Sequence, residues 1–187
     1  MTESGASIKK AVRFMEQVHD SVYRLIVQAD QDMAEHKWVP GPSSKITEGL
    51  TNGLSANKEW AISWLMRAYT RSSDKNYASR LHAVIYIDLN PDDFEEPVCF
   101  GMVLRYPKEL TWAEIWNGCA DEFDWLNKLE LNGSPKVFGE KEMQEAFPGV
   151  QSVGIFALPL LRFEDAAAVA ERLVQPLISL ALDQANP

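Results

Sequence analysis

The chain has 187 residues, of which 46% are hydrophobic and 24% charged, a balance typical of a single globular domain. Its formal net charge of -9 works against binding to nucleic acid or anionic lipid, because both rely on clustered lysine and arginine. A basic protein partner suits this charge better. The chain starts with a polar stretch and contains no apolar run of about 18 residues, so we expect a cytoplasmic protein that does not enter a membrane.

Residues 8–35 have the apolar spacing of a long helix. The residues that recur at alternating intervals of four and three are Ala11, Met15, Val18, Val22, Leu25 and Ala29. We expect this stripe to pack on the protein's own core, and burial against a second copy in a homodimer is the alternative. Residues 1–7 are expected to be a flexible lead-in, and the Pro- and Gly-rich residues 36–57 a long loop.

Three segments then alternate between apolar and polar residues, which is the pattern of half-buried strands. Residues 59–71 show this alternation, although the spacing of their tryptophans also suits a helix. The alternation is clearer in residues 80–89 and 98–106. Because short connections join the three segments, an antiparallel meander is the most economical topology.

The sequence around residue 111 contains a complete helix start. Thr111 can cap the helix, and Glu114 lies three residues later, where a capping box requires it. We therefore expect a helix from Trp112 to about Leu126, ended by the "LNGSP" stretch.

The remaining elements are a short helix in residues 140–147, a strand in 150–161 and a helix in 164–184. Pro159 is expected at a strand end or a sheet edge, and Pro176 is expected to kink the last helix. The element order predicts a single α+β domain, residues 1–187. We expect an antiparallel sheet of about four strands, a three-strand meander plus one later strand, packed by the N-terminal, middle and C-terminal helices.

The connection between the second and third predicted strands is densely acidic. Its carboxylates are Asp88, Asp92, Asp93, Glu95 and Glu96. A calcium loop of the EF-hand type needs a glycine at its sharp turn, and this stretch has none. We therefore expect a solvated loop without a metal or cofactor. Its last four acidic residues are available to a basic partner.

Asp88 differs from its neighbours because it belongs to the preceding strand. If the strands align, one sheet face carries a polar set that could recognise a carboxylate or a phosphate. The residues of this set are Arg67, Tyr69, Arg71, His82, Tyr86, Asp88 and Arg105. The alternative is that these side chains only pair with one another across the sheet and are covered by a helix.

Signatures of catalysis are missing from the sequence. It contains no G-x-S-x-G turn, no G-x-x-x-x-G-K-[ST] loop and no H-E-x-x-H helix. Cys99 and Cys119 lie in apolar stretches, so we expect both thiols to be buried. Trp38 and Trp125 lie away from the apolar stripes and are predicted to be exposed anchors for a partner.

The element order and the acidity resemble those of small bacterial secretion chaperones of α+β type, although this chain is longer and shares no motif with them. Our first hypothesis is a non-catalytic binding protein of the bacterial cytoplasm, such as an immunity or inhibitor protein or a chaperone, that holds a protein partner through its acidic surface. The second is a small-molecule-binding protein or an enzyme whose site lies on the polar sheet face.

Overall fold

A computed structural model describes residues 3–41, 47–48, 64–71, 77–89, 91, 94–116 and 129–185. The helices are α1 (Glu3–Glu35), α2 (Trp112–Trp116), α3 (Glu140–Met143), α4 (Ala166–Val169) and α5 (Gln175–Ala185), with a 3-10 turn η3 (Leu160–Arg162) and a π-helical turn η4 (Ala170–Val174). The strands are β1 (Val39–Pro40), β2 (Thr47–Glu48), β3 (Trp64–Thr70), β4 (Ser79–Asp88), β5 (Val98–Leu110), β6 (Lys136–Gly139) and β7 (Ser152–Pro159).

The strands form one antiparallel sheet in the order β1-β3-β4-β5-β7-β6, and β2 also pairs with β3. The predicted α+β class is therefore confirmed, as are the meander β3-β4-β5 and the later strand β7, which pairs with β5. The sheet is larger than expected because β1, β2 and β6 are added at its edges. Each of these strands has two to four residues, too few for an alternating pattern to be visible in the sequence.

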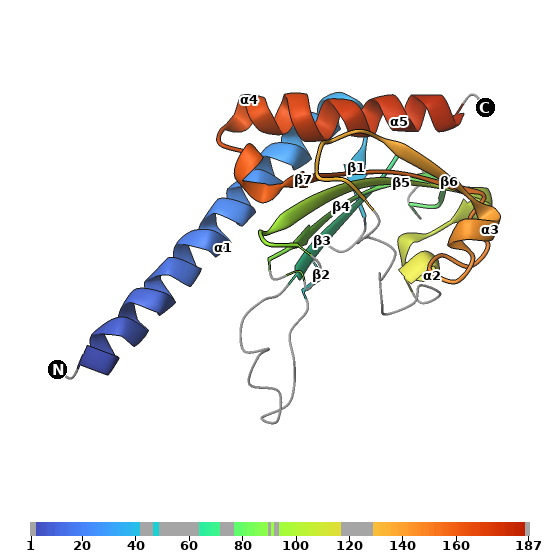
Figure 1. Ribbon diagram of the computed structural model, residues 1–187. Helices are drawn as coiled ribbons and strands as arrows, with labels where there is room; N and C mark the ends of the chain where they lie inside the picture. Colours follow the sequence, from blue (N-terminus) through green and yellow to red (C-terminus); the bar gives the residue numbers. More distant parts are fainter. Residues whose placement is uncertain are drawn as a thin grey trace.

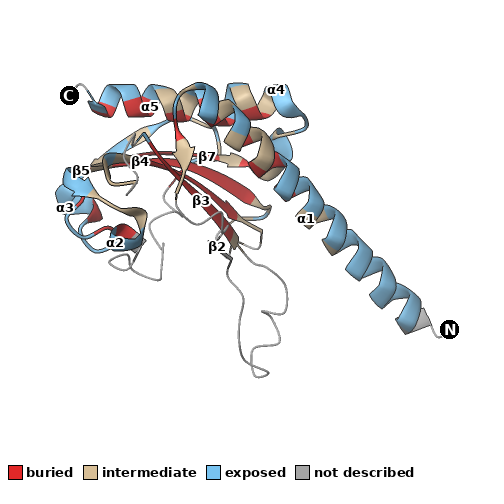
Figure 2. Ribbon diagram, turned by 180° about the vertical axis from the view of Figure 1, so that it is seen from behind, coloured by how far each residue is buried: buried red, intermediate tan, exposed pale blue. Residues whose placement is uncertain are grey.

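Helices of the protein lie on both faces of the sheet, along the whole of one face and at one end of the other (Figure 1). On one face α1 packs together with the continuous helical segment of α4, η4 and α5. On the other face α2, α3 and the residues around them form a second core cluster. The central strands are consequently buried on both sides, as Figure 2 shows in red.

Only the second half of α1 belongs to the core. Its apolar residues from Val22 to Met33 are buried against the sheet and against α4–η4. The first half projects away from the rest of the molecule and is exposed (Figures 1 and 2). The helix begins at Glu3, inside the segment 1–7 that we expected to precede it.

The predicted capping box at the start of α2 is present. The Thr111 backbone N–H donates to Glu114 Oε2 at 2.7 Å, and the Glu114 N–H donates to Thr111 Oγ1 at 3.3 Å. The helix begins at Trp112 as expected, and Ile115 enters the core. Residues 117–128, which hold the rest of the predicted helix, Cys119 and Trp125, lie outside the described residues.

Other predictions are confirmed in part. The expected short helix is present as α3, and Pro159 is the last residue of β7. The segment 36–57 is not a loop throughout, because β1 and β2 lie within it and extend the sheet beside β3.

In the last helix, the π-helical turn η4 directly precedes the turn that contains Pro176. This wider turn suits a proline that has no N–H to donate to the previous turn.

α5 is tied to the sheet by a buried glutamine. Gln184 Nε2 donates to the Val103 carbonyl oxygen of β5 at 3.2 Å, and Ser152 Oγ of β7 donates to Gln184 Oε1 at 2.9 Å. These bonds satisfy a polar side chain inside the core and hold α5 across two strands. Among the described residues, no helix is long and apolar enough to cross a membrane.

Candidate functional site

The predicted polar face is divided between the two sides of the sheet. In the β3–β4 register, Arg67 lies opposite Ile85 and Tyr69 opposite Ala83. His82 instead lies opposite Thr70, so it points to the other side of the sheet. The prediction of one shared face was wrong, because alternation within each strand does not determine which positions of two strands lie opposite each other.

The seven residues therefore form two sets. Those on the α1 side are Arg67, Tyr69, Arg71 and Arg105, and those on the α2 and α3 side are His82, Tyr86 and Asp88. Arg71 is the only exposed member of the two sets and the other six are buried or half-buried, so neither set forms an open polar surface. The geometric basis for the small-molecule hypothesis is thus lost, while ligand binding by any single member of the sets stays a prediction.

Arg67 is paired with an acidic residue of α1. Its Nε donates to Asp30 Oδ1 at 3.0 Å and its Nη2 to Asp30 Oδ2 at 2.5 Å, which is a two-point ion pair. Burial disfavours the guanidinium charge, but the bonds and the attraction of Asp30 outweigh it and raise the pKa of Arg67 above its usual value. This arginine is occupied by a contact that joins α1 to β3.

Tyr69 lies beside this ion pair and is completely buried. Burial first, and then the nearby Asp30 carboxylate, raise the pKa of the Tyr69 hydroxyl well above its usual value. Within the part of the chain that the structure describes, this hydroxyl has no hydrogen-bond partner of standard geometry. Together the three side chains form a polar island in the core under α1.

His82 is buried on the opposite side of the sheet. Its Nε2 lies 3.0 Å from the Ser79 carbonyl oxygen, which can only accept, and its ring contacts those of Tyr106 and Trp112. Burial lowers the pKa of His82, although the backbone hydrogen bonds to Ser79 and Leu110 oppose the shift. Burial thus favours the neutral imidazole, which lies against two aromatic rings.

Tyr86 and Asp88 share the face of His82. The Tyr86 ring lies 5.9 Å from that of Trp64 and 5.8 Å from that of Phe100, measured between centroids. Burial, and to a smaller extent the Asp88 carboxylate, raise the pKa of the Tyr86 hydroxyl. Asp88 is half-buried at the end of β4.

Trp38, predicted to be an exposed anchor, is instead buried at 1% exposure. It follows α1 directly and folds back into the core beneath it. Trp38 and the exposed Arg71 line the same pocket, of about 130 Å³, together with residues of α5. Its lining includes no acidic residue, and its volume is below the roughly 300 Å³ at which ligand pockets begin.

The predicted acidic partner site is described only in part. Glu95 is exposed and Glu96 half-buried in the connection between β4 and β5. Asp92 and Asp93 lie outside the described residues. Partner binding through these four residues stays a prediction.

The structure brings a second group of acidic residues together at the other end of β5. Here α2 and α3 pack on the same core cluster through Ile115 and Met143. The exposed glutamates on and around these helices, which we name the acidic end, are Glu109, Glu114, Glu130, Glu140, Glu142 and Glu145. Sequence reasoning missed this group because its members are scattered over 37 positions of the chain and form no run.

Metal chemistry has no support in the described residues, where no group of three or more His, Cys, Asp and Glu side chains could hold an ion. Cys99 is buried as predicted, and burial raises the pKa of its thiol, so that it is not a nucleophile in the folded state.

Comparison with models of known protein families, with curated proteins and with solved structures found no match.

Proposed function

We propose that the chain is a non-catalytic binding protein of the bacterial cytoplasm, of the immunity, inhibitor or chaperone kind. In this proposal it holds a basic protein partner through its acidic surface. The observation that carries the proposal is the acidic end, where six glutamates are exposed beside three lysines, Lys108, Lys136 and Lys141. Opposite charge on a partner speeds its approach and aligns it on the surface.

Two features of the acidic end support a role in docking. Its helices are anchored in the core, so the carboxylates are presented on a fixed surface. Six glutamates against three lysines also leave this end with a net negative charge, and the ion pair described there, between Lys136 Nζ and Glu130 Oε1, is long at 3.9 Å and partly exposed.

The proposal is tested by capture from a native lysate with tagged protein, at low and at high salt. We expect a stoichiometric basic partner that is retained at low salt and released at high salt. Glu140→Lys with Glu145→Lys, two exposed changes in and beside α3, should weaken capture by about tenfold or more.

The matched control carries the same charge change elsewhere, as Glu164→Lys just before α4 with Glu171→Lys in η4. It should capture the partner as well as the unchanged protein does. Failure to recover any stoichiometric partner, or equal loss in both double variants, would contradict the proposal.

A further inference from the structure

The small pocket beside Trp38 lies where the end of α1, the end of β3 and the helix α5 meet. It has a volume of about 130 Å³, and its lining residues are His36, Trp38, Arg71, Ile178, Ala181 and Leu182. His36 directly follows α1, and Arg71 directly follows β3. Because these segments are far apart in the sequence, only the fold brings the lining together.

The turn after α1 fixes two of the lining residues in place. The Trp38 N–H donates to the Met33 carbonyl oxygen at 3.0 Å, and the Lys37 N–H donates to the Ala34 carbonyl oxygen at 2.9 Å. These are the two bonds of a Schellman motif, and Lys37 takes the left-handed conformation that the motif requires, with φ of 64°. His36 and Trp38 are therefore held on one fixed turn.

The charged side chains that line the pocket are basic, although the protein is acidic. The chain has 27 acidic residues against 18 lysines and arginines, yet Arg71 and His36 line the pocket and no acidic residue does. Gln175 Nε2 of α5 lies 3.4 Å from His36 Nε2 and holds the imidazole beside the pocket. A lining of this kind favours an anion.

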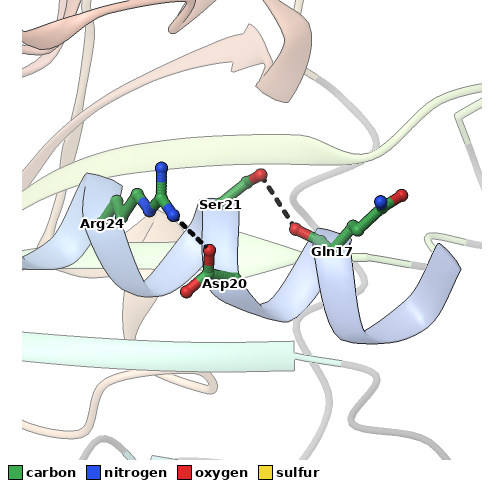
Figure 3. Close-up of polar contacts among 4 residues, drawn as sticks. All are labelled: Gln17, Asp20, Ser21 and Arg24. Carbon is green, nitrogen blue, oxygen red and sulfur yellow. Dashed lines mark hydrogen bonds and ion pairs between the residues drawn. The ribbon is translucent and has the colours of Figure 1, made fainter. Parts of the chain in front are cut away.

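Arg71 differs from two other arginines of the protein. Arg67 is paired with Asp30, and Arg24 Nη2 lies 2.6 Å from Asp20 Oδ2 (Figure 3). Arg71 is exposed and has no ion pair with another described residue. Its planar guanidinium can therefore form a two-point ion pair with a carboxylate that comes from outside the chain.

A larger pocket, of about 340 Å³ between α1 and the start of α4, lacks this character. Arg24 lines it, but so do Glu164 and Asp165. Two carboxylates repel an anion, and Arg24 is already paired with Asp20. Among these two pockets, the smaller one is therefore the better site for an anion.

We propose that the smaller pocket binds a short aliphatic monocarboxylate. The carboxylate of the ligand pairs with Arg71, and its alkyl chain packs on Ile178, Ala181 and Leu182, which form the apolar part of the lining. The inference does not depend on the proposed function.

The volume of the pocket limits the size of this ligand. A space of about 130 Å³ holds about four water molecules, at roughly 30 Å³ each. Carboxylates of about four to six non-hydrogen atoms, from acetate to butyrate, match this space. Inorganic phosphate is also small enough, but it would leave the apolar part of the lining without a contact. Since a ligand of so few atoms binds weakly, we expect a dissociation constant of about 0.1 to 10 mM for butyrate.

The test is titration of the isotope-labelled full chain with sodium butyrate up to about 50 mM, followed by NMR at constant ionic strength. The side-chain N–H signal of Arg71 and the methyl signals of Ile178 and Leu182 should shift and saturate. Acetate lacks two methylene groups and should bind about threefold to tenfold more weakly. Inorganic phosphate and butylamine, which lack the alkyl chain and the negative charge respectively, should each bind at least about tenfold more weakly.

Two variants remove the features that the site needs. Arg71→Gln removes the charged donor and should weaken butyrate binding by about tenfold or more. Leu182→Glu places a carboxylate in the lining and should weaken binding to a similar extent. The matched control Arg24→Gln removes another exposed arginine, outside this pocket, and should leave binding within about twofold.

Three results would overturn the inference. The first is the absence of any saturating shift with butyrate. The second is equal binding of butyrate and phosphate, because the apolar part of the lining would then make no contribution. The third is an equal loss of binding in Arg71→Gln and Arg24→Gln, which would place the site elsewhere. The backbone amide spectrum of each variant shows that the fold is intact, which is expected because Arg71, Leu182 and Arg24 are exposed.

Discussion

Arg67 and Asp30 form a two-point ion pair between β3 and α1, with Nε 3.0 Å from Oδ1 and Nη2 2.5 Å from Oδ2. The Arg67 side chain is 9% exposed and that of Asp30 28%. The contact joins the helix to the sheet at the boundary of the core. Its energetic role is chiefly to satisfy a guanidinium that the fold has already buried.

Removal of Asp30 tests that role. Asp30→Ala leaves the Arg67 charge buried without its partner. The free energy of unfolding should therefore fall by about 2–3 kcal/mol. This is a small loss for a broken buried pair, and it is expected because Asp30 is partly exposed. Asp30→Ala combined with Arg67→Met should be less destabilised than Asp30→Ala alone, since no unpaired charge is then buried. Urea unfolding of the two variants and of the unchanged protein measures both effects, and equal destabilisation of the single and double variants would argue against the explanation.

Gly101 is required by an aromatic ring on the next strand. A Cβ at this position would lie 2.3 Å from Phe156 Cζ, because the ring lies over the glycine. Gly101→Ala should therefore destabilise the protein by about 1–3 kcal/mol through overpacking, measured as a shift in the urea midpoint. At Gly139 the nearest atom to an added Cβ is 3.9 Å away, so Gly139→Ala is a control that should change stability by less than about 1 kcal/mol.

His82 makes stability depend on pH. Burial lowers its pKa below the ordinary 6.5, so near neutral pH the unfolded chain takes up a proton more readily than the folded protein. Stability should be complete above about pH 6.5 and should decrease as the pH falls below it.

The measurement is chemical unfolding at several pH values between about 7 and 5, above the range in which most carboxylates titrate. His82→Gln should show a shallower loss of stability across this window than the unchanged protein. Identical slopes in the two proteins would exclude His82 as the source.

Cys99 should be protected from thiol reagents. Its side chain is completely buried, and burial raises the pKa of the thiol, so that the reactive thiolate is absent in the folded state. In a Cys119→Ser variant, an aromatic disulfide reagent should label Cys99 at least about a hundredfold more slowly in buffer than in urea. Rapid labelling without denaturant would show that β5 opens readily.

Local patterns in the sequence were enough to predict several elements. The capping box of Thr111 and Glu114 sets the start of α2, because both groups of the motif lie within one turn. The alternation in β4 and β5 predicts strands, since residues two apart share a face. The three-residue and four-residue intervals in α1 predict a helix for the same kind of reason.

Contacts between distant segments were not predictable in this way. Asp30 and Arg67 are 37 residues apart, and nothing near either residue indicates the other. Trp38 looked like an exposed anchor because it lies beside the Pro- and Gly-rich stretch, yet the turn after α1 returns it to the core. The polar face was placed wrongly because alternation defines two sides for each strand and leaves their alignment open.

The sequence by itself determined the type of most elements and the apolar side of each, because helix and strand periodicity come from backbone geometry within a few residues. The tertiary structure alone decided which sides meet, which polar groups are buried together and where on α1 the core ends. The intervals in α1 are the same before and after Val22, and only the position of the body distinguishes the buried half from the uncovered one. Burial depends on which segments occupy the space around a residue, and that is a property of the whole fold.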